Sequence, residues 1–257
     1  SAADASNAWA VGDGGVILRT TDGGADWTQE AASISQGLNG VDALDATHVW
    51  TVGEAGTGRA YVAWGRASWP GGDPFNPTLP DLSLNGIDAF DYCGVPLSAG
   101  DHNGDGYDDL VVGSSEAAGP GNARGSCGEA YVVNGRPRAS FPDPLNLSTG
   151  ASCTIYGGSV LDNFPTSVVN PLEDLNGDGR ADLVFGDIRA DGPGDARAGC
   201  GEVAAIYGGA LPATFDLAAR APDVLVYGPT EAAGAGRDVD VLDFDADGVM
   251  DLAASAP

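Results

Sequence analysis

The sequence of 257 residues contains no lysine, and its 11 basic residues are all arginines, against 37 aspartates and glutamates. The formal net charge at pH 7 is −26. A surface of this sign repels phosphate groups, which excludes nucleic acid and anionic membrane surfaces as partners. No apolar run approaches the roughly 18 residues of a membrane-spanning helix. We therefore expect no membrane insertion.

Histidine is also scarce, since His48 and His102 are the only two. They form no evident Ser/His/Asp set, and the four cysteines show no CxxC spacing typical of zinc sites. No glycine-rich phosphate loop precedes a helical pattern. These absences predict that the protein is not an enzyme.

Glycine, in contrast, is abundant, with 40 residues, and short apolar runs alternate with turn residues. This composition is typical of a sandwich, barrel or propeller, and predicts an all-β fold.

A nine-residue acidic loop occurs three times, at 101–109, 174–182 and 243–251. Each copy has oxygen-bearing side chains at positions one, three, five and nine and a glycine at position six. A hard cation such as Ca²⁺ prefers six to eight oxygens, and the glycine permits a tight bend. The backbone carbonyl of position seven adds a further oxygen. We therefore predict three calcium sites.

The residues after each loop decide the type of calcium motif. An EF-hand needs a glutamate at position twelve, where this chain has Val112, Phe185 or Ala254. The first two loops run into short apolar segments that end in glycine, at 109–113 and 182–186. These segments predict buried strands, so we expect a strand–loop–strand hairpin around each calcium ion.

Residues 1–57 follow a repeat of their own, in which Trp9 and Trp50 are 41 residues apart. This interval fits one four-stranded propeller blade. Between them, Thr20-Thr-Asp-Gly-Gly-Ala-Asp-Trp27 resembles the Asp-box of BNR repeats, as found in propellers like the photosystem II stability/assembly factor. The resemblance implies a structural hairpin turn, and we expect this turn to bury Trp27.

Residues 58–257 contain a different repeat. Ala60-Tyr-Val-Ala-Trp-Gly-Arg66 is echoed by the segments 130–136 and 203–209, and the first two calcium loops are 73 residues apart. With Tyr156-Gly157 and Tyr227-Gly228, this pattern resembles the FG-GAP repeat of integrin α-subunit propellers. The resemblance implies a β-propeller of four-stranded antiparallel blades that continues from the blade in 1–57. Counting strands gives either about five blades or an incomplete fragment of a larger ring.

In the FG-GAP family each loop joins the first two strands of a blade and binds one Ca²⁺. Carried over to this chain, the implied ligands are Asp101, Asn103, Asp105, Tyr107 and Asp109; Asp174, Asn176, Asp178, Arg180 and Asp182; and Asp243, Asp245, Asp247, Val249 and Asp251. Tyr107, Arg180 and Val249 would act through their carbonyl oxygens.

The even number of cysteines, next to calcium loops, predicts an oxidising compartment. Cys127 and Cys200 occupy the same position of the repeat, so we expect adjacent blades to hold them beyond the roughly 7 Å reach of a disulfide. The predicted bridges are therefore Cys93–Cys127 and Cys153–Cys200.

Together these features predict a secreted or cell-surface module, with a periplasmic location as the alternative. Its function would be adhesion, assembly or binding of a protein ligand, and neighbouring domains or subunits would be partners. Two alternatives are a glycan-binding lectin, with Trp64, Trp69 and Tyr92 as stacking platforms, and the accessory domain of a secreted hydrolase.

Overall fold

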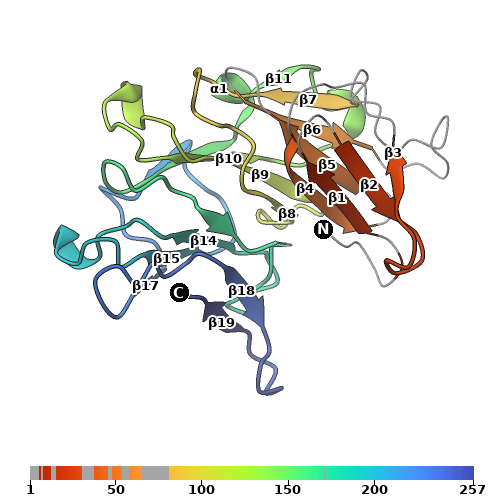
Figure 1. Cartoon of the computed structure of the whole chain (residues 1–257). Coiled ribbons are helices and arrows are strands. Elements are labelled where there is room, and N and C mark those ends of the chain that lie inside the picture. Colours follow the sequence, from red (N-terminus) through yellow and green to blue (C-terminus); the bar gives the residue numbers. More distant parts are fainter. Residues whose placement is uncertain are drawn as a thin grey trace. The chain divides into compact units, whose positions relative to one another are not determined.

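The computed structural model describes residues 6, 8–12, 16–30, 38–45, 48–53, 58–64, 81–170 and 172–257 (Figure 1). The chain forms two compact units. The first contains residues 1–95 and 137–149, and the second contains residues 96–136 and 150–257. No helix in the described ranges is both long and apolar enough to cross a membrane.

The first unit contains two described sheets. One has the strand order β1-β2-β3 and the other β11-β7-β6-β5-β4. Their bounds are β1 Ala8–Gly12, β2 Val16–Thr20, β3 Thr28–Glu30, β4 Leu38–Asp45, β5 His48–Gly53, β6 Arg59–Ala63, β7 Leu82–Asn85 and β11 Leu145–Asn146. β5 and β6 pair in one antiparallel sheet. The predicted change of repeat type near residue 57 falls on residues 54–57, outside the described ranges, and stays a prediction.

The Asp-box segment forms the turn between β2 and β3, as predicted. The Thr20 hydroxyl donates to Asp22 Oδ1 (2.7 Å) and accepts from the Gly24 N–H (2.9 Å), while Asp22 accepts from the Asp26 N–H (3.0 Å). The expectation that this turn buries Trp27 is wrong, because Trp27 is 46% exposed. The indole Nε1 lies 3.8 Å from where a Cβ on Gly24 would be, so the ring contacts the turn at this glycine.

The second unit contains three antiparallel arrangements that repeat along the chain. The first four-stranded run is β8-β9-β10-β12, the second is β13-β14-β15-β17, and β18-β19 form a two-stranded sheet. Their bounds are β8 Leu97–Gly100, β9 Asp109–Ser114, β10 Glu129–Val133, β12 Cys153–Tyr156, β13 Ser167–Val168, β14 Leu183–Asp187, β15 Glu202–Ile206, β17 Val224–Tyr227, β18 Val239–Leu242 and β19 Asp251–Ala254.

Short elements connect these strands. β16 (Thr214–Asp216) adds to the first run as a parallel neighbour of β12. The remaining elements are α1 (Leu147–Gly150) and 3₁₀ turns at Pro120–Asn122, Arg138–Ser140 and Pro193–Asp195. The prediction of an all-β chain built from four-stranded antiparallel propeller blades is confirmed by these sheets. The number of blades stays a prediction.

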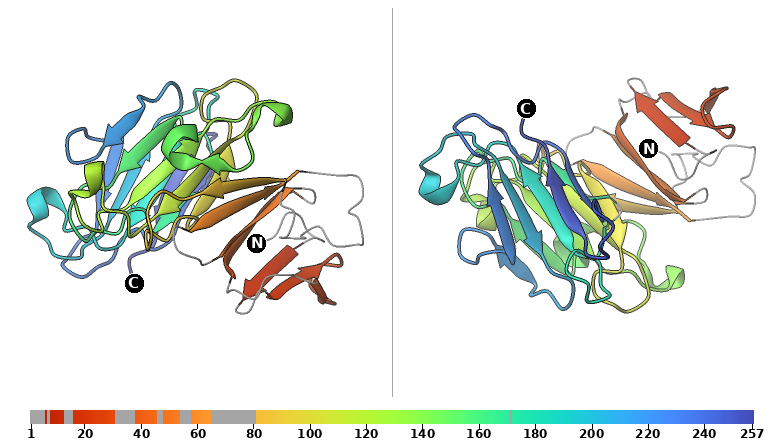
Figure 2. Two further views of the ribbon diagram at one scale, coloured as in Figure 1. Left: turned by 90° about the horizontal axis from the view of Figure 1, so that it is seen from above. Right: turned by 90° about the horizontal axis from the view of Figure 1, so that it is seen from below.

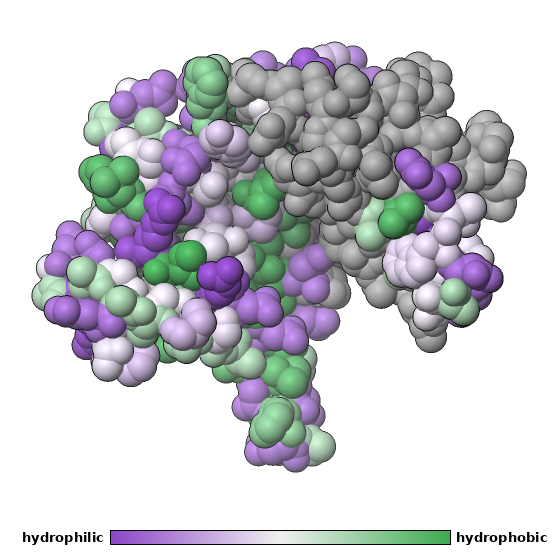
Figure 3. All heavy atoms as spheres, viewed as in Figure 1, coloured by the Kyte–Doolittle hydropathy of each residue, from purple (hydrophilic) through white to green (hydrophobic). Residues whose placement is uncertain are grey.

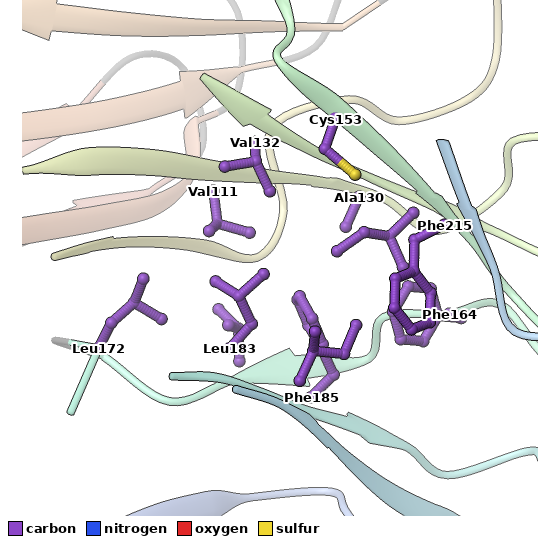
Figure 4. Close-up of a cluster of buried hydrophobic side chains, with 12 residues drawn as sticks. Val111, Ala130, Val132, Cys153, Phe164, Leu172, Leu183, Phe185 and Phe215 are labelled. Carbon is purple, nitrogen blue, oxygen red and sulfur yellow. The ribbon is translucent and has the colours of Figure 1, made fainter. Parts of the chain in front are cut away.

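The sheets of the second unit stack through both faces of β14. Alternate side chains of a strand point to opposite faces. Leu183 and Phe185 accordingly join the core cluster that contains Val111 and Ile155 of the first sheet (Figure 4). Val184 joins a second cluster, which contains Val241 of β18. Burial on both faces explains why β14 is a continuous apolar run, and Figure 2 shows the resulting layers of strands.

The two predicted disulfides are absent from the structure, in which all four cysteines are buried and none is disulfide-bonded. Cys153 lies on β12 inside the first core cluster, whereas Cys200 precedes β15 and its Sγ donates to the Gly201 carbonyl (3.3 Å). Cys127 makes the equivalent bond to the Gly128 carbonyl (3.4 Å). Burial raises the pKa of both Cys127 and Cys153 to about 11, so these thiols remain protonated at neutral pH.

Glycines allow the loops of the first blade to approach its backbone closely. Gly128 has φ +81°, and a Cβ added there would lie 1.6 Å from the Phe164 carbonyl oxygen. The equivalent Gly201 would collide with the backbone of Ala235 at 2.2 Å. The same close contact therefore fixes the loop after the fourth strand in both repeats.

Replacing Gly128 with alanine should lower the free energy of unfolding by about 3 kcal/mol, because backbone must move and a left-handed conformation is strained. Chemical denaturation would measure the loss. Gly125→Ala is the control, since that glycine is exposed and a Cβ there meets nothing within 4 Å. Equal stability of the two variants would contradict the close contact.

Candidate metal sites

Antiparallel hairpins hold the three acidic loops, as predicted. Gly100 at the end of β8 pairs with Asp109 at the start of β9, and Leu242 of β18 pairs with Asp251 of β19. In the second repeat, Glu173 forms an isolated bridge with Asp182. The carboxylate at position nine therefore sits where the second strand begins, at the base of its loop.

A chain of local hydrogen bonds shapes the first loop. Asp101, at position one, accepts from the N–H groups of Gly104 (2.8 Å), Asp105 (3.0 Å) and Gly106 (2.8 Å). Asn103 Oδ1 accepts from the Asp105 N–H (2.8 Å), and Asp105 Oδ1 accepts from the Tyr107 N–H (2.9 Å). Such Asx turns fix the side chains of alternate residues within one tight bend.

The second loop repeats this geometry. Asp174 accepts from the N–H groups of residues 177 (2.7 Å), 178 (3.1 Å) and 179 (2.7 Å). Asn176 and Asp178 accept from the residues two places further on, both at 2.9 Å. Equal bonds in two loops that are 73 residues apart show that the spacing of residue types determines the turn.

The carboxylates at position nine are buried in the first two loops, whereas Asp251 of the third loop is exposed. Asp109 and Asp182 are both 0% exposed. Asp109 accepts from the Asn103 N–H (3.1 Å) and from the Gly135 N–H (2.8 Å). Burial raises the pKa of Asp109 to about 6, with further upward contributions from Asp105 and Asp101. Burial also raises the pKa of Asp182. The energetic cost of holding these carboxylates ionised is of the kind that a bound cation offsets.

Sequence reasoning missed the glycines that anchor position nine. Gly135 donates to Asp109, and Gly208, its counterpart 73 residues later, donates to Asp182 Oδ1 (2.6 Å). A Cβ at Gly135 would lie 2.3 Å from the Asp108 carbonyl oxygen, so only glycine allows this approach. The signal was present in the sequence, because both glycines stand at the sixth position of the repeated segments 130–136 and 203–209.

The third loop brings three carboxylates together. Oxygens of Asp243, Asp245 and Asp247 lie within 4.8 Å of one another. Asp243 accepts from the N–H groups of residues 247 (3.1 Å) and 248 (3.0 Å), as in the other loops. Position three is an aspartate here, where the first two loops have Asn103 and Asn176. The third loop therefore offers one more negative charge to a cation.

The third loop differs from the other two in its residue at position two, which is exposed. His102 is 1% exposed, and its Nδ1 lies 3.1 Å from the Ala181 carbonyl oxygen of the next repeat. This side chain packs into protein, and burial lowers its pKa. Leu175 packs on the second core cluster. Phe244 is instead 83% exposed, and Figure 3 shows hydrophobic and hydrophilic residues together at the end of this protruding hairpin.

The chemistry of the donor set fits a hard divalent cation. Each loop offers four side chains with oxygen donors at the predicted positions, and no histidine or cysteine points into the described turns. All-oxygen donor sets select Ca²⁺ or Mg²⁺ over softer metals. Calcium tolerates the larger and less regular set of oxygens that a nine-residue loop presents.

No protein-family model matches the chain. A phosphatidylinositol-glycan-specific phospholipase D of Dictyostelium discoideum is 34% identical over 123 residues, covering 45% of this chain and 13% of that protein. Integrin alpha-5 of Xenopus laevis is 28% identical over 149 residues, covering 58% of this chain and 12% of that protein. The chain thus spans only 13% and 12% of the length of these relatives.

Among solved structures, the chain aligns with one titled "YCF48 bound to D1 peptide" at 14% identity and a TM-score of 0.42. The alignment covers 94% of this chain and 57% of that one. The integrin match supports a β-propeller, and the FG-GAP and BNR assignments stay predictions.

Position four of the loops yields a matched pair of substitutions. Gly104 and Gly177 have φ +78° and +77°, and the third loop has Ala246 at φ +61°. A Cβ at Gly177 meets nothing within 4 Å. Gly177→Ala should therefore destabilise the protein by about 1 kcal/mol through backbone conformation alone. Ala246→Gly should stabilise it by less than this, because glycine also gains freedom in the unfolded chain. Thermal unfolding would compare both variants, and shifts of the same sign would contradict this account.

Proposed function

We propose that the chain is an FG-GAP-type β-propeller module whose three hairpin loops each bind one Ca²⁺. The observation that carries this proposal is the recurrence of one loop geometry, with the N–H groups of positions five and six donating to the carboxylate of position one, between paired strands of successive repeats. A single acidic turn would be a poor argument, but recurrence in register with the sheets favours a shared ligand.

In this proposal the side chains at positions one, three, five and nine and the carbonyl at position seven contact the ion. Calcium would supply the positive charge that offsets repulsion among the carboxylates of a loop. The residues assigned this role are Asp101, Asn103, Asp105, Tyr107, Asp109, Asp174, Asn176, Asp178, Arg180, Asp182, Asp243, Asp245, Asp247, Val249 and Asp251.

We further propose that the module is extracellular, non-catalytic and used to bind a protein ligand in adhesion or assembly. The similarity to an integrin subunit supports a protein-binding role. The metal ions would stabilise the blades without taking part in a reaction. The phospholipase D match favours one alternative, in which the chain is the accessory domain of a secreted hydrolase.

The lectin alternative has less support. Trp64 is partly buried, and its ring packs at 5.6 Å from that of Phe141, with the Arg138 guanidinium 5.6 Å from its centroid. Trp69 lies outside the described residues. Tyr92, at 51% exposed, remains available for stacking.

Calcium should act on stability. Extracellular modules bind Ca²⁺ with a Kd on the order of 0.1–1 mM. With about 2 mM free calcium and a Kd near 0.1 mM, mass action contributes roughly 1.8 kcal/mol per site and about 5 kcal/mol for three sites. Removing calcium with a chelator should therefore lower the melting temperature by many degrees, and Mg²⁺ should restore it poorly because it requires tighter geometry. A melting temperature that does not respond to excess chelator would contradict the proposal.

Asp178→Ala should remove one of three bound calcium ions, counted by native mass spectrometry or calcium titration. Asp108→Ala is the matched control, because Asp108 stands at position eight of the first loop, is exposed and is not an assigned ligand. The control should retain three ions. Three ions in the Asp178 variant would contradict the assignment of Asp178 as a ligand that its site requires.

A further inference from the structure

A cavity of about 440 Å³ lies in the second unit, at the end of β14 away from its calcium loop. Its walls come from the loop after β12, the end of β14 with the loop that follows, the start of β15, residues 217–218 and β17. None of the residues that line it is basic. Five are acidic, namely Asp162, Asp187, Asp191, Asp195 and Glu202.

Backbone N–H groups donate hydrogen bonds to the innermost carboxylates, but no basic side chain lines the cavity to balance their charge. Asp187 ends β14 directly opposite Glu202 on β15. Asp162 and Asp187 are only 6% and 7% exposed. Asp187 Oδ1 accepts from the N–H groups of Arg189 (3.1 Å) and Ala190 (3.2 Å). Within the described ranges no donor reaches Asp187 Oδ2, so a side chain more than nine-tenths buried directs an open acceptor at the cavity.

The ionised state of this group is costly. Burial raises the pKa of Asp162 to about 6 and that of Glu202 to about 7, and it raises the pKa of Asp187 well above its usual value. The charge of Asp162 adds to the rise at both Asp187 and Glu202. A cation in the cavity would remove this cost.

The preceding repeat shows how the cavity arises. There, Glu129 occupies the position of Glu202, and its Oε2 accepts a hydrogen bond from the Tyr131 hydroxyl (2.6 Å). Tyr131 is 0% exposed, so its ring fills the space beside the carboxylate. Its counterpart 73 residues later is Ala204, which lines the cavity. Loss of the phenol therefore opens the space and removes the donor that satisfied the glutamate.

The same comparison shows that the second repeat has more acidic residues around this space than the first, on a backbone of the same conformation. Residues Ser114, Ala118 and Asn122 of the first repeat correspond to Asp187, Asp191 and Asp195. The loop framework is unchanged, since Gly119 and Gly192 have φ values of +68° and +70° before equivalent 3₁₀ turns. Compared with the first repeat, the second thus has three more carboxylates around this space and Ala204 in place of Tyr131.

The dimensions favour an organic cation over a metal ion. Among the described residues, only the third calcium loop brings three acidic ligand atoms within 4.8 Å of one another. The cavity also has apolar walls, because Phe164 and Phe185, whose rings pack at 5.0 Å (Figure 4), line it together with Leu217 and Tyr227. A guanidinium or ammonium group on an alkyl chain offers several separated donors and an apolar stem.

We propose that this cavity is a binding site for an organic cation, an alkylguanidinium or alkylammonium group. The source is either a small amine or an arginine or lysine side chain of a peptide. The site shares no residue with the calcium loops, so it goes beyond the calcium proposal. Ligand binding to the cavity is measured in excess calcium, so that any calcium sites are saturated. A failure of the calcium proposal would then not change the result at the cavity.

Isothermal titration of the full chain with agmatine at pH 8 tests the site. We expect saturable binding of one agmatine per chain and no binding of N-butylurea, which has a similar shape but no charge. Asp187→Ser, which installs the residue of the preceding repeat, should weaken binding about tenfold or more, because a charge-assisted hydrogen bond is lost. Ala204→Tyr should abolish binding by refilling the space. Glu116→Gln, at the position of the first repeat that corresponds to Arg189, should leave binding unchanged.

The peptide Gly-Gly-Arg-Gly-Gly distinguishes the two sources. Tighter binding of the peptide than of agmatine indicates a protein partner, and the reverse indicates a small amine. Failure of both to bind would overturn the proposal, as would binding that neither Asp187→Ser nor Ala204→Tyr weakens. Should the tyrosine variant fail to fold, the serine variant alone decides.

Protons should compete with the ligand. Agmatine affinity is expected to fall between pH 8 and pH 5, because the acidic groups with raised pKa values lose their charge in this range. Arg189, beside the cavity, donates to Asn163. The titratable groups that face the cavity are Asp162 after β12, Asp187, Asp191 and Asp195 on β14 and its loop, Glu202 on β15 and Tyr227 on β17. Affinity that is independent of pH would place the ligand elsewhere.

Discussion

Packing on both faces of β14 is the constraint on which the second unit depends. Alternate residues of this strand enter two separate apolar clusters, so one strand connects the first sheet with β18. The strand is only five residues long. Its two ends therefore emerge directly at the two edges of the layered sheets, and both edges carry acidic residues: Asp182 just before the strand and Asp187 at its end.

The positions of these charges follow from the same packing. A carboxylate cannot remain ionised within the layers without a partner, so the acidic residues gather where the strands end. At one edge, backbone N–H groups arrange the carboxylates into loops that suit a small hard ion. At the other edge, neighbouring loops spread them around a wider space. The two ends of one strand thus carry two different kinds of acidic site.

The features that the sequence predicts well are those that depend on residues close together in the chain. The calcium-loop turns form between neighbouring residues, as with Asp101 and Gly106, so spacing alone predicts their geometry. The alternation of apolar residues in the strands is local in the same sense.

Features that depend on residues farther apart in the sequence were harder to predict. The exposure of Trp27, the buried thiols of Cys127 and Cys153, and the anchoring of Asp109 by Gly135 all depend on which backbone lies opposite. The cavity required a comparison of two repeats at a single pair of positions, Tyr131 and Ala204. Its signal is the absence of a side chain, which a search for motifs does not detect.

The rates at which the buried cysteines are alkylated can report local opening of the structure. Only the thiolate reacts with alkylating reagents, and pKa values of about 11 keep Cys127 and Cys153 protonated as long as the sheets remain closed. Modification must therefore wait for an opening event, in the way that a buried amide waits to exchange its hydrogen. Cys153 lies between stacked sheets and Cys127 in a loop at their edge, so their two labelling rates distinguish separation of the layers from local opening of the loop.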